Sequence, residues 1–211
     1  MQRCAVFCAI SLALASTAVA DDKCRQAVTD AFTKQRSSPA FVVNSELKSP
    51  AGPVNIEVQY QPPDRMHQTI RAPSQEPLET VLYGMRAYSR QGGPWKELMP
   101  ALAQTIIAQV RAAAVDPPQE VGDFECVGNS GFEGKEYLAY RSVEKHVDAG
   151  AATGSPPMHR TIYVDPKTGL PAVNIVAGEA PGSELVFKST YDYPEKLEIE
   201  DHPDAPLVQP R

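Results

Sequence analysis

The chain has 211 residues, of which 42% are hydrophobic, and a formal net charge of −6 from 26 acidic and 20 basic residues. This length suits one domain and is enough to bury a core. The acidic balance argues against nucleic acid and anionic membrane surfaces as partners, because both are polyanions. The 20 prolines occur mostly in pairs or beside glycine, which is typical of turns between elements.

Residues 1–20 have the features of a secretion signal. Arg3 gives a positive start, an apolar run extends from Ala5 to about Ala15, and Ala18-Val19-Ala20 has the small-x-small pattern that signal peptidase cleaves. Because the apolar run is too short to span a bilayer, we expect cleavage and no transmembrane anchor. Removal leaves residues 21–211, about 190 residues, which we expect to form a single domain in the periplasm.

The signal segment divides the four cysteines into two pairs. Cys4 and Cys8 leave with it, whereas Cys24 and Cys126 remain in an oxidising compartment, where a disulfide between them is the expected state. The alternatives are two free thiols or a redox pair, although the two residues have no CxxC spacing. Closing a loop of about 100 residues would stabilise the fold by about 4–5 kcal/mol in the chain-entropy model.

The first expected element is a helix from Asp22 to Arg36. Its apolar residues recur at helical spacing, and its acidic start suits a helix N-terminus. This apolar stripe contains Cys24, Ala27, Val28, Ala31 and Phe32. Strands follow, because β-forming residues alternate with polar ones between turn sequences. The expected strands cover residues 41–48, 54–60, 65–72, 78–83 and 85–90.

A second helix is expected from Trp95 to about Ala114, with apolar residues along one face. These residues are Leu98, Leu102, Ile106 and Val110. Pro94 suits the first turn of a helix. Pro100 also lies in the early turns, so the helix either starts after it or is kinked there.

The second half of the chain returns to strands. They are expected at residues 122–127, 136–147, 159–164, 170–177 and 183–193. Turns are expected at Gly128–Gly131, 133–135 and Asp165–Gly169, with a flexible loop over 149–157 and an extended, mobile tail over 195–211. Two helices that alternate with groups of strands predict an α+β fold with a large antiparallel sheet.

No pattern of residues indicates a catalytic reaction. The four histidines, His67, His146, His159 and His202, form neither an HExxH pattern nor an i, i+4 pair, so we expect no metal site and no cofactor. No GxSxG motif occurs, and the stretch around Ser130 predicts a hairpin turn. A small hydrolase stays an alternative, which would need His67 and His159, or His159 and Asp165, to meet in a cleft.

The apolar helix face that begins at Trp95, the sole tryptophan, has two interpretations. It either packs on the sheet, as amphipathic helices do, or lines a cavity between helix and sheet that holds an acyl chain. Periodicity does not separate these interpretations, because both need an apolar face.

Two segments resemble a known family. Tyr60–His67, followed by Glu79–Tyr83 and then Trp95, is similar to the strand–PDR–strand pattern of LolA-like periplasmic lipoprotein carriers. Tyr163–Pro171 resembles the DPKTGLP hairpin of the same superfamily, and Tyr191-Asp192-Tyr193 ends the strand that follows. The resemblance implies an α+β fold in which a curved antiparallel sheet, a half-barrel, has helices covering its concave face.

The resemblance further implies a non-enzymatic carrier in the periplasm that binds a lipid, the acyl chain of a lipoprotein or another apolar ligand. The ligand residues it implies are on the helix face of Trp95, Leu98, Leu102 and Ile106. Two other functions stay open, an envelope protein-interaction module that uses the sheet edge and the small periplasmic hydrolase. The expected partners are an apolar small molecule, a lipid or an envelope protein, and not nucleic acid.

Overall fold

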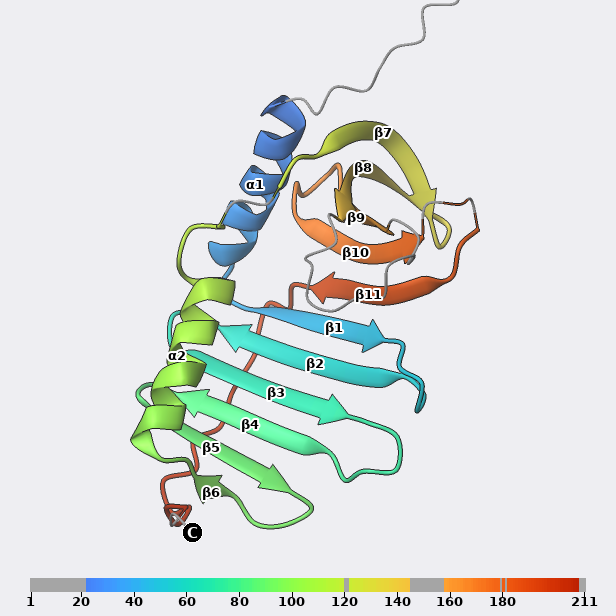
Figure 1. Cartoon of the computed structure of the whole chain (residues 1–211). Coiled ribbons are helices and arrows are strands. Elements are labelled where there is room, and N and C mark those ends of the chain that lie inside the picture. The colour runs from blue at the N-terminus through green and yellow to red at the C-terminus, as the bar shows by residue number, and fades with distance from the viewer. Residues whose placement is uncertain (1–21, 120–121, 145–157, 179, 181, 209–211) are drawn as a thin grey trace, which may run out of the picture.

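The computed structural model describes residues 22–119, 122–144, 158–178, 180 and 182–208 (Figure 1). The expected signal segment, the expected loop over 149–157 and His146 lie outside these residues. Within the described ranges the order of elements is helix, six strands, helix, five strands. This order is the α+β arrangement that the sequence predicts.

One antiparallel sheet contains all eleven described strands, in the order β6-β5-β4-β3-β2-β1-β11-β10-β9-β8-β7. The strands are β1 (Phe41–Leu47), β2 (Val54–Gln61), β3 (Arg65–Arg71), β4 (Leu78–Tyr83), β5 (Arg86–Gln91), β6 (Lys96–Glu97), β7 (Glu125–Phe132), β8 (Lys135–Glu144), β9 (Met158–Val164), β10 (Pro171–Gly178) and β11 (Leu185–Asp192). The chain builds outwards from β1 to β6, continues at the far edge with β7, and returns so that β11 pairs with β1. The sheet curves without closing, and β6 and β7 are its two ends (Figure 1).

Both helices, α1 (Asp22–Arg36) and α2 (Pro100–Ala114), lie on the same, concave face of the sheet. Residues paired across antiparallel strands project to one side, so the strand residues beneath each helix reveal its face. Tyr140 and Ile162 pair beneath α1, and Met66 and Leu82 pair beneath α2. The register through the intervening strands places both pairs on one side, which confirms the half-barrel prediction. In the part of the chain described, neither helix is long and apolar enough to cross a bilayer.

Helix α2 begins at Pro100, later than the expected start at Trp95. Lys96–Glu97 instead form β6, and the amide of Leu98 donates to the carbonyl of Ala87 at 2.8 Å, which keeps this stretch extended. Proline suits the first position of a helix because it has no N–H to leave unpaired there. Of the two expectations for Pro100, the later helix start is therefore the one observed.

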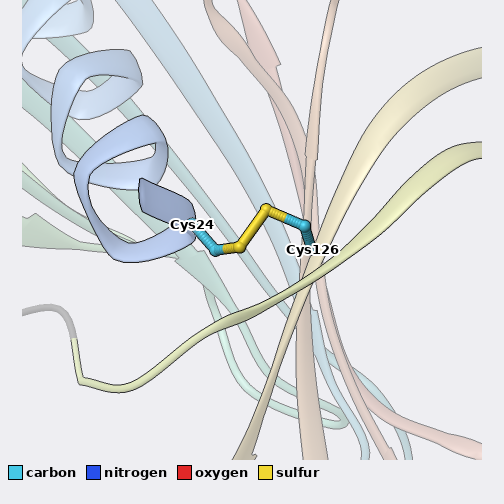
Figure 2. Close-up of a disulfide and its surroundings, with 2 residues drawn as sticks. All are labelled: Cys24 and Cys126. Atoms are coloured by element: carbon cyan, nitrogen blue, oxygen red, sulfur yellow. A yellow bond between two sulfur atoms is a disulfide. The ribbon is translucent and has the colours of Figure 1, made fainter. Parts of the chain in front are cut away.

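Cys24 on α1 and Cys126 on β7 form the expected disulfide (Figure 2). Their Cα atoms are 5.3 Å apart, although 102 positions separate the two residues in the sequence. Cys24 is buried in the cluster beneath α1, beside Val28 and Phe124. The bond therefore joins the first helix to an edge strand on the concave side of the sheet.

The stretch Gly128–Gly131, expected to be a turn, lies inside strand β7. Gly128 has a φ of 87° at a register shift that follows Cys126, so it accommodates a β-bulge and the strand continues. The turn comes later, at Glu133-Gly134, where both residues have the positive φ that a type I′ hairpin needs. The prediction of a turn around Ser130 is therefore wrong.

Residues 194–208, which we name the C-terminal strap, cross the convex face of the sheet (Figure 1). Ile199 of the strap is 3% exposed and packs in one cluster with Val81 and Tyr88. Both of these strand residues project away from the helices, since Val81 is paired with Tyr88 and each neighbours a residue buried beneath α2. The strap thus covers the face that the helices leave free.

Backbone hydrogen bonds fix the end of the strap to β6. The amide of Glu97 donates to the carbonyl of Pro206 at 2.9 Å, and the amide of Val208 donates back to the carbonyl of Glu97 at 2.8 Å. The sequence predicts an extended, mobile tail over 195–211. The segment is extended, and Leu197, Ile199 and Ala205 pack on the convex face, whereas Leu207 is 55% exposed. The mobility of this segment stays a prediction.

Candidate ligand-binding face

The two faces of the sheet differ in charge. On the eight consecutive strands from β5 to β9 in sheet order, all of which the structure describes, Arg160 is the sole charged side chain on the concave face. The other concave positions of these strands carry apolar, hydroxyl or amide side chains or glycine. The convex positions carry charges of both signs, among them Glu46, Glu57, Arg65, Arg71, Glu79, Arg86, Arg90 and Lys188.

Helix α2 covers only one end of the strands beneath it. Met66 and Leu82 are 5% and 1% exposed in the cluster that α2 forms with the sheet. Leu78 lies on the same strand and the same face as Leu82, four residues earlier, and is 37% exposed. Burial on the concave face therefore decreases along β4, away from the helix.

Apolar side chains continue across the concave face at this less covered end, and we name seven of them the open strip. They are Leu47, Val54, Ile56, Ile70, Leu78, Val176 and Phe187. Ile56, Ile70 and Leu78 lie opposite one another on β2, β3 and β4. Val54, Leu47, Phe187 and Val176 form the adjoining row on β2, β1, β11 and β10. Leu47 is 43% exposed and most of the strip is half-buried, so the described residues leave it partly open to solvent.

The centre of the concave face, between the two helices, is polar but uncharged. The hydroxyls of Ser45 and Ser189 share a hydrogen bond of 2.6 Å across β1 and β11. Tyr191 packs edge-to-face against Phe32 of α1 with ring centroids 6.2 Å apart, and burial raises the pKa of Tyr191 to about 12. These neutral groups can meet the polar part of a ligand without the penalty of desolvating a charge.

The structure brings together two of the four residues predicted to form the ligand face. Leu98 and Ile106 pack in the concave cluster beneath α2, whereas Leu102 is 48% exposed. Trp95 lies on the convex face, in the cluster of Ile199. An extended segment separates Trp95 from Leu98, and an odd offset along an extended chain places two side chains on opposite faces. A ligand role for Leu98 and Ile106 stays a prediction.

Trp95 belongs to a polar and aromatic cluster beneath the strap. Its ring stacks on His202 of the strap at 4.2 Å between centroids, and the guanidinium of Arg90 lies 4.5 Å from the centroid of the same ring. Burial lowers the pKa of His202, which keeps its imidazole neutral against the indole. These contacts hold the strap on the sheet.

Glu79 anchors the same cluster. Its carboxylate accepts a 2.8 Å hydrogen bond from Arg90 and lies 3.1 Å from Nε2 of His67. The hydrogen bond from Arg90, with a smaller contribution from His67, holds the pKa of Glu79 below its usual value. His67 is thus engaged with a structural carboxylate on the convex face, a pairing that strand alternation does not reveal.

The groups that a hydrolase would need do not converge. His67 is on β3 and His159 on β9, five strand spacings apart, or about 24 Å. Asp165 follows the far end of β9 from His159, and its carboxylate accepts the amides of Lys167 and Thr168 at 2.7 and 3.1 Å. Asp165 therefore holds a turn, and among the described residues no group of three His, Cys, Asp or Glu is placed to bind a metal ion.

A groove of about 820 Å³ lies beside this turn. Its wall carries charges of both signs from the β7–β8 hairpin, the Asp165–Leu170 turn and β11. Among the described residues that line it there is neither histidine nor cysteine. The groove is also more charged than the concave face, which makes it the weaker site for an apolar ligand.

Comparison with known proteins supports the fold. No protein family model and no curated protein sequence matches the chain. Among solved structures, the lipoprotein LppX of Mycobacterium tuberculosis matches with a TM-score of 0.56 and 11% identity, over 85% of this chain and 100% of that chain. LprF of Mycobacterium bovis matches with a TM-score of 0.55 and 11% identity, over 86% and 97% of the two chains.

The chain thus has the curved half-barrel fold that its sequence resemblance implies, and it shares this fold with LppX and LprF. The LolA superfamily protein NE2245 from Nitrosomonas europaea also matches at 12% identity, over 86% of this chain and 94% of that chain. Its TM-score is 0.27, and no argument rests on that likeness. At these identities the likeness concerns the fold alone.

Proposed function

We propose that this protein is an exported, non-enzymatic carrier that holds a lipid, a lipoprotein acyl chain or another apolar ligand against the concave face of its half-barrel. The observation that carries the proposal is the contrast in charge between the two faces. Arg160 is the one charge on the concave side of eight strands, and an apolar strip on that side is partly open. Soluble proteins rarely expose a contiguous apolar surface without a binding role.

The energetics of the concave face favour an acyl chain. Backbone N–H and C=O groups in the interior of the sheet are paired in the ladder, so a ligand can displace water from the strip without leaving them unpaired. Each CH₂ group transferred from water to such a surface contributes about 0.8 kcal/mol. No charged side chain of the open strip has to be desolvated, because the strip has none.

Two further features support an envelope location. The Cys24–Cys126 disulfide fits an oxidising compartment, which the expected signal segment would reach. LppX, one of the proteins with the same fold, is described as a lipoprotein. The periplasm is therefore the proposed place of action.

A second candidate function is an envelope protein-interaction module. Strand β7 forms one edge of the sheet, and Val127 on it is 41% exposed. An exposed edge can accept a strand from another protein through main-chain hydrogen bonds. This candidate uses the edge and not the concave face, so mutations on the two surfaces separate the two functions.

Native mass spectrometry after mild extraction, together with titration of a dansyl-labelled fatty acid, tests the carrier proposal. Ile56→Asp places a charge in the open strip, and Asn55→Asp places the same charge on the neighbouring residue of the convex face. We expect Ile56→Asp to weaken probe binding at least tenfold and Asn55→Asp to leave it unchanged, with both variants checked for folding by circular dichroism.

The proposal fails if the protein always emerges empty and the fatty-acid probe does not bind. A stable co-purified protein, lost on mutation of the β7 edge and unaffected by Ile56→Asp, would favour the interaction module instead. Equal binding by the Ile56→Asp and Asn55→Asp variants would show that a ligand binds elsewhere.

A further inference from the structure

Arg160 lies at the end of one row of the open strip. It is paired with Val176 across β9 and β10, and Val176 is paired with Phe187 on β11. The same row continues through Leu47 on β1 to Val54 on β2. One line across the concave face therefore begins with a guanidinium and continues through four apolar side chains.

The length of this row suits a long acyl chain. Four strand spacings separate β9 from β2, which corresponds to about 19 Å. A chain laid across the strands along this row would place its polar end at Arg160 and its methyl end near Val54. The next row carries Asn174 and the Ser45–Ser189 hydroxyl pair, which add neutral hydrogen-bonding groups beside the polar end.

Arg36 is a second cation on this side of the sheet, and across β8 and β9 Glu144 is paired with Met158, two positions from Arg160. Arg36 of α1 donates to the carbonyls of Phe32 and Ala112 at 3.2 Å each, so it links the two helices. Burial raises the pKa of Tyr191, while the charges of Arg160 and Arg36 both act in the opposite direction. The positive charges of Arg160 and Arg36 therefore both act on Tyr191, which lies on the concave face.

We propose that Arg160 recognises the anionic head group of an amphiphile whose chain lies along the Val176–Phe187–Leu47–Val54 row. This inference rests on the proposed carrier function and specifies its ligand class as a carboxylate or phosphate amphiphile. A guanidinium presents parallel N–H donors that match two oxygens of either group, and charge-assisted hydrogen bonds of this kind are the stronger ones.

Arg160 already takes part in an interaction within the protein, so a head group would join or exchange with that contact. The expected gain is therefore a preference and not an absolute requirement. We expect an anionic ligand to bind about tenfold more tightly than a neutral ligand with the same chain.

Displacement of the dansyl-labelled fatty acid by ligands that share one oleoyl or oleyl chain tests the inference. The ligands are oleate, oleoyl lysophosphatidylglycerol, oleyl alcohol and oleylamine. The wild-type protein is expected to prefer the two anions over the alcohol. Arg160→Gln is expected to remove this preference while leaving the affinity for the alcohol unchanged.

Two further variants and one control sharpen the result. Arg160→Lys is expected to keep part of the preference, and Arg160→Glu to shift it towards oleylamine. Arg71→Gln removes a cation from the convex face of β3 and is expected to change nothing. If Arg160→Gln weakens the binding of oleate alone, a free fatty acid is the source of the head group. If it weakens the binding of the lysophospholipid alone, the source is a phospholipid.

An equal anion-to-alcohol ratio in the wild-type and Arg160→Gln proteins, with the alcohol still bound, would overturn the head-group inference while the carrier function stands. Failure of all four ligands to bind the folded wild-type protein would overturn both. The two failures are thus distinguishable in one set of titrations.

Discussion

The concave and convex faces of the same strands differ in how many charged side chains they carry. The convex face mixes charged, polar and apolar side chains, and Arg90 with Glu79 and Arg86 with Glu97 form ion pairs at 2.8 Å. The concave face is buried beneath helices in two places and nearly free of charge between them, although Leu47 and Leu78 are partly exposed. Under the carrier proposal, this difference arises because the concave strip meets an apolar ligand, whereas the convex face meets water.

The largest expected effect concerns the attachment of α1 to the concave face. Replacing Cys24 and Cys126 together by serine removes a cross-link between residues 102 positions apart. We expect the free energy of unfolding to fall by about 4–5 kcal/mol, because the unfolded chain regains the conformational freedom that the cross-link removes. Urea denaturation of the variant and of the oxidised wild type measures this, and a loss below about 1 kcal/mol would contradict the chain-entropy account.

The second prediction compares two leucines on one face of one strand. Leu82 is 1% exposed beneath α2, and Leu78 in the open strip is 37% exposed. Leu82→Ala is expected to destabilise the fold by about 3 kcal/mol, and Leu78→Ala by about 1 kcal/mol or less, because cavity formation needs full burial. In the fatty-acid titration, Leu78→Ala is expected to weaken binding. A Leu78→Ala variant that unfolds as readily as Leu82→Ala would show that the strip is ordinary core.

The third prediction concerns the strap on the convex face. His202→Ala removes the ring that stacks on Trp95, and a loss of about 1 kcal/mol is expected for an aromatic pair. Since Trp95 is the sole tryptophan, its emission reports on the strap, and we expect a shift towards the spectrum of an exposed indole. Asp204→Ala, at an exposed strap position, serves as the control. An unchanged emission spectrum in His202→Ala would mean that the strap is not held through this stack.

The smallest effect is a pH dependence of the strap. Burial lowers the pKa of His202 below its usual 6.5, so between these two values the unfolded chain binds more protons than the folded one. Stability is therefore expected to fall as the pH is lowered below about 6.5. Glu79 adds a second loss at lower pH, because the hydrogen bond from Arg90 lowers its pKa and this stabilisation disappears as the carboxylate becomes protonated.

Trp95 emission and the urea midpoint, measured from pH 7.5 to 4, follow both steps. We expect His202→Ala to lose the step that begins below about pH 6.5 and to retain the later step that belongs to Glu79. Identical profiles for the wild type and His202→Ala would assign the titration to another group.

Much of the fold follows from the sequence. The helix from Asp22 to Arg36 and the strand from Leu78 to Tyr83 have the predicted bounds, because their periodicity is uninterrupted. The start of α2 depends on whether Lys96 and Glu97 pair with β5, which is a tertiary contact that local spacing does not contain. The residues around the bulge at Gly128 have the composition of a turn, and composition does not distinguish a bulge from a turn. The prediction of a turn there is therefore wrong.

The candidate site was only partly predictable for a similar reason. Alternation in residues 54–60 indicates that one side of the strand is apolar, but it does not say which sides of separate strands join into one face. The open strip depends on the register between β1 and β11, which lie far apart in sequence. The sequence predicts Trp95 on the ligand face because it predicts a helix there, whereas the chain before β6 is extended and Trp95 packs with Ile199 of the strap.

The most direct test of the central claim is photolabelling with a diazirine-bearing fatty acid, followed by residue-level mass spectrometry. If the concave face holds the ligand, labels will appear on open-strip residues such as Leu47, Ile56 and Phe187, and will be absent from their convex neighbours Asn55 and Lys188. Competition by unlabelled oleate will reduce the labelling. Labels confined to the strap or to the β7 edge, or an equal distribution over the two faces, would contradict the account.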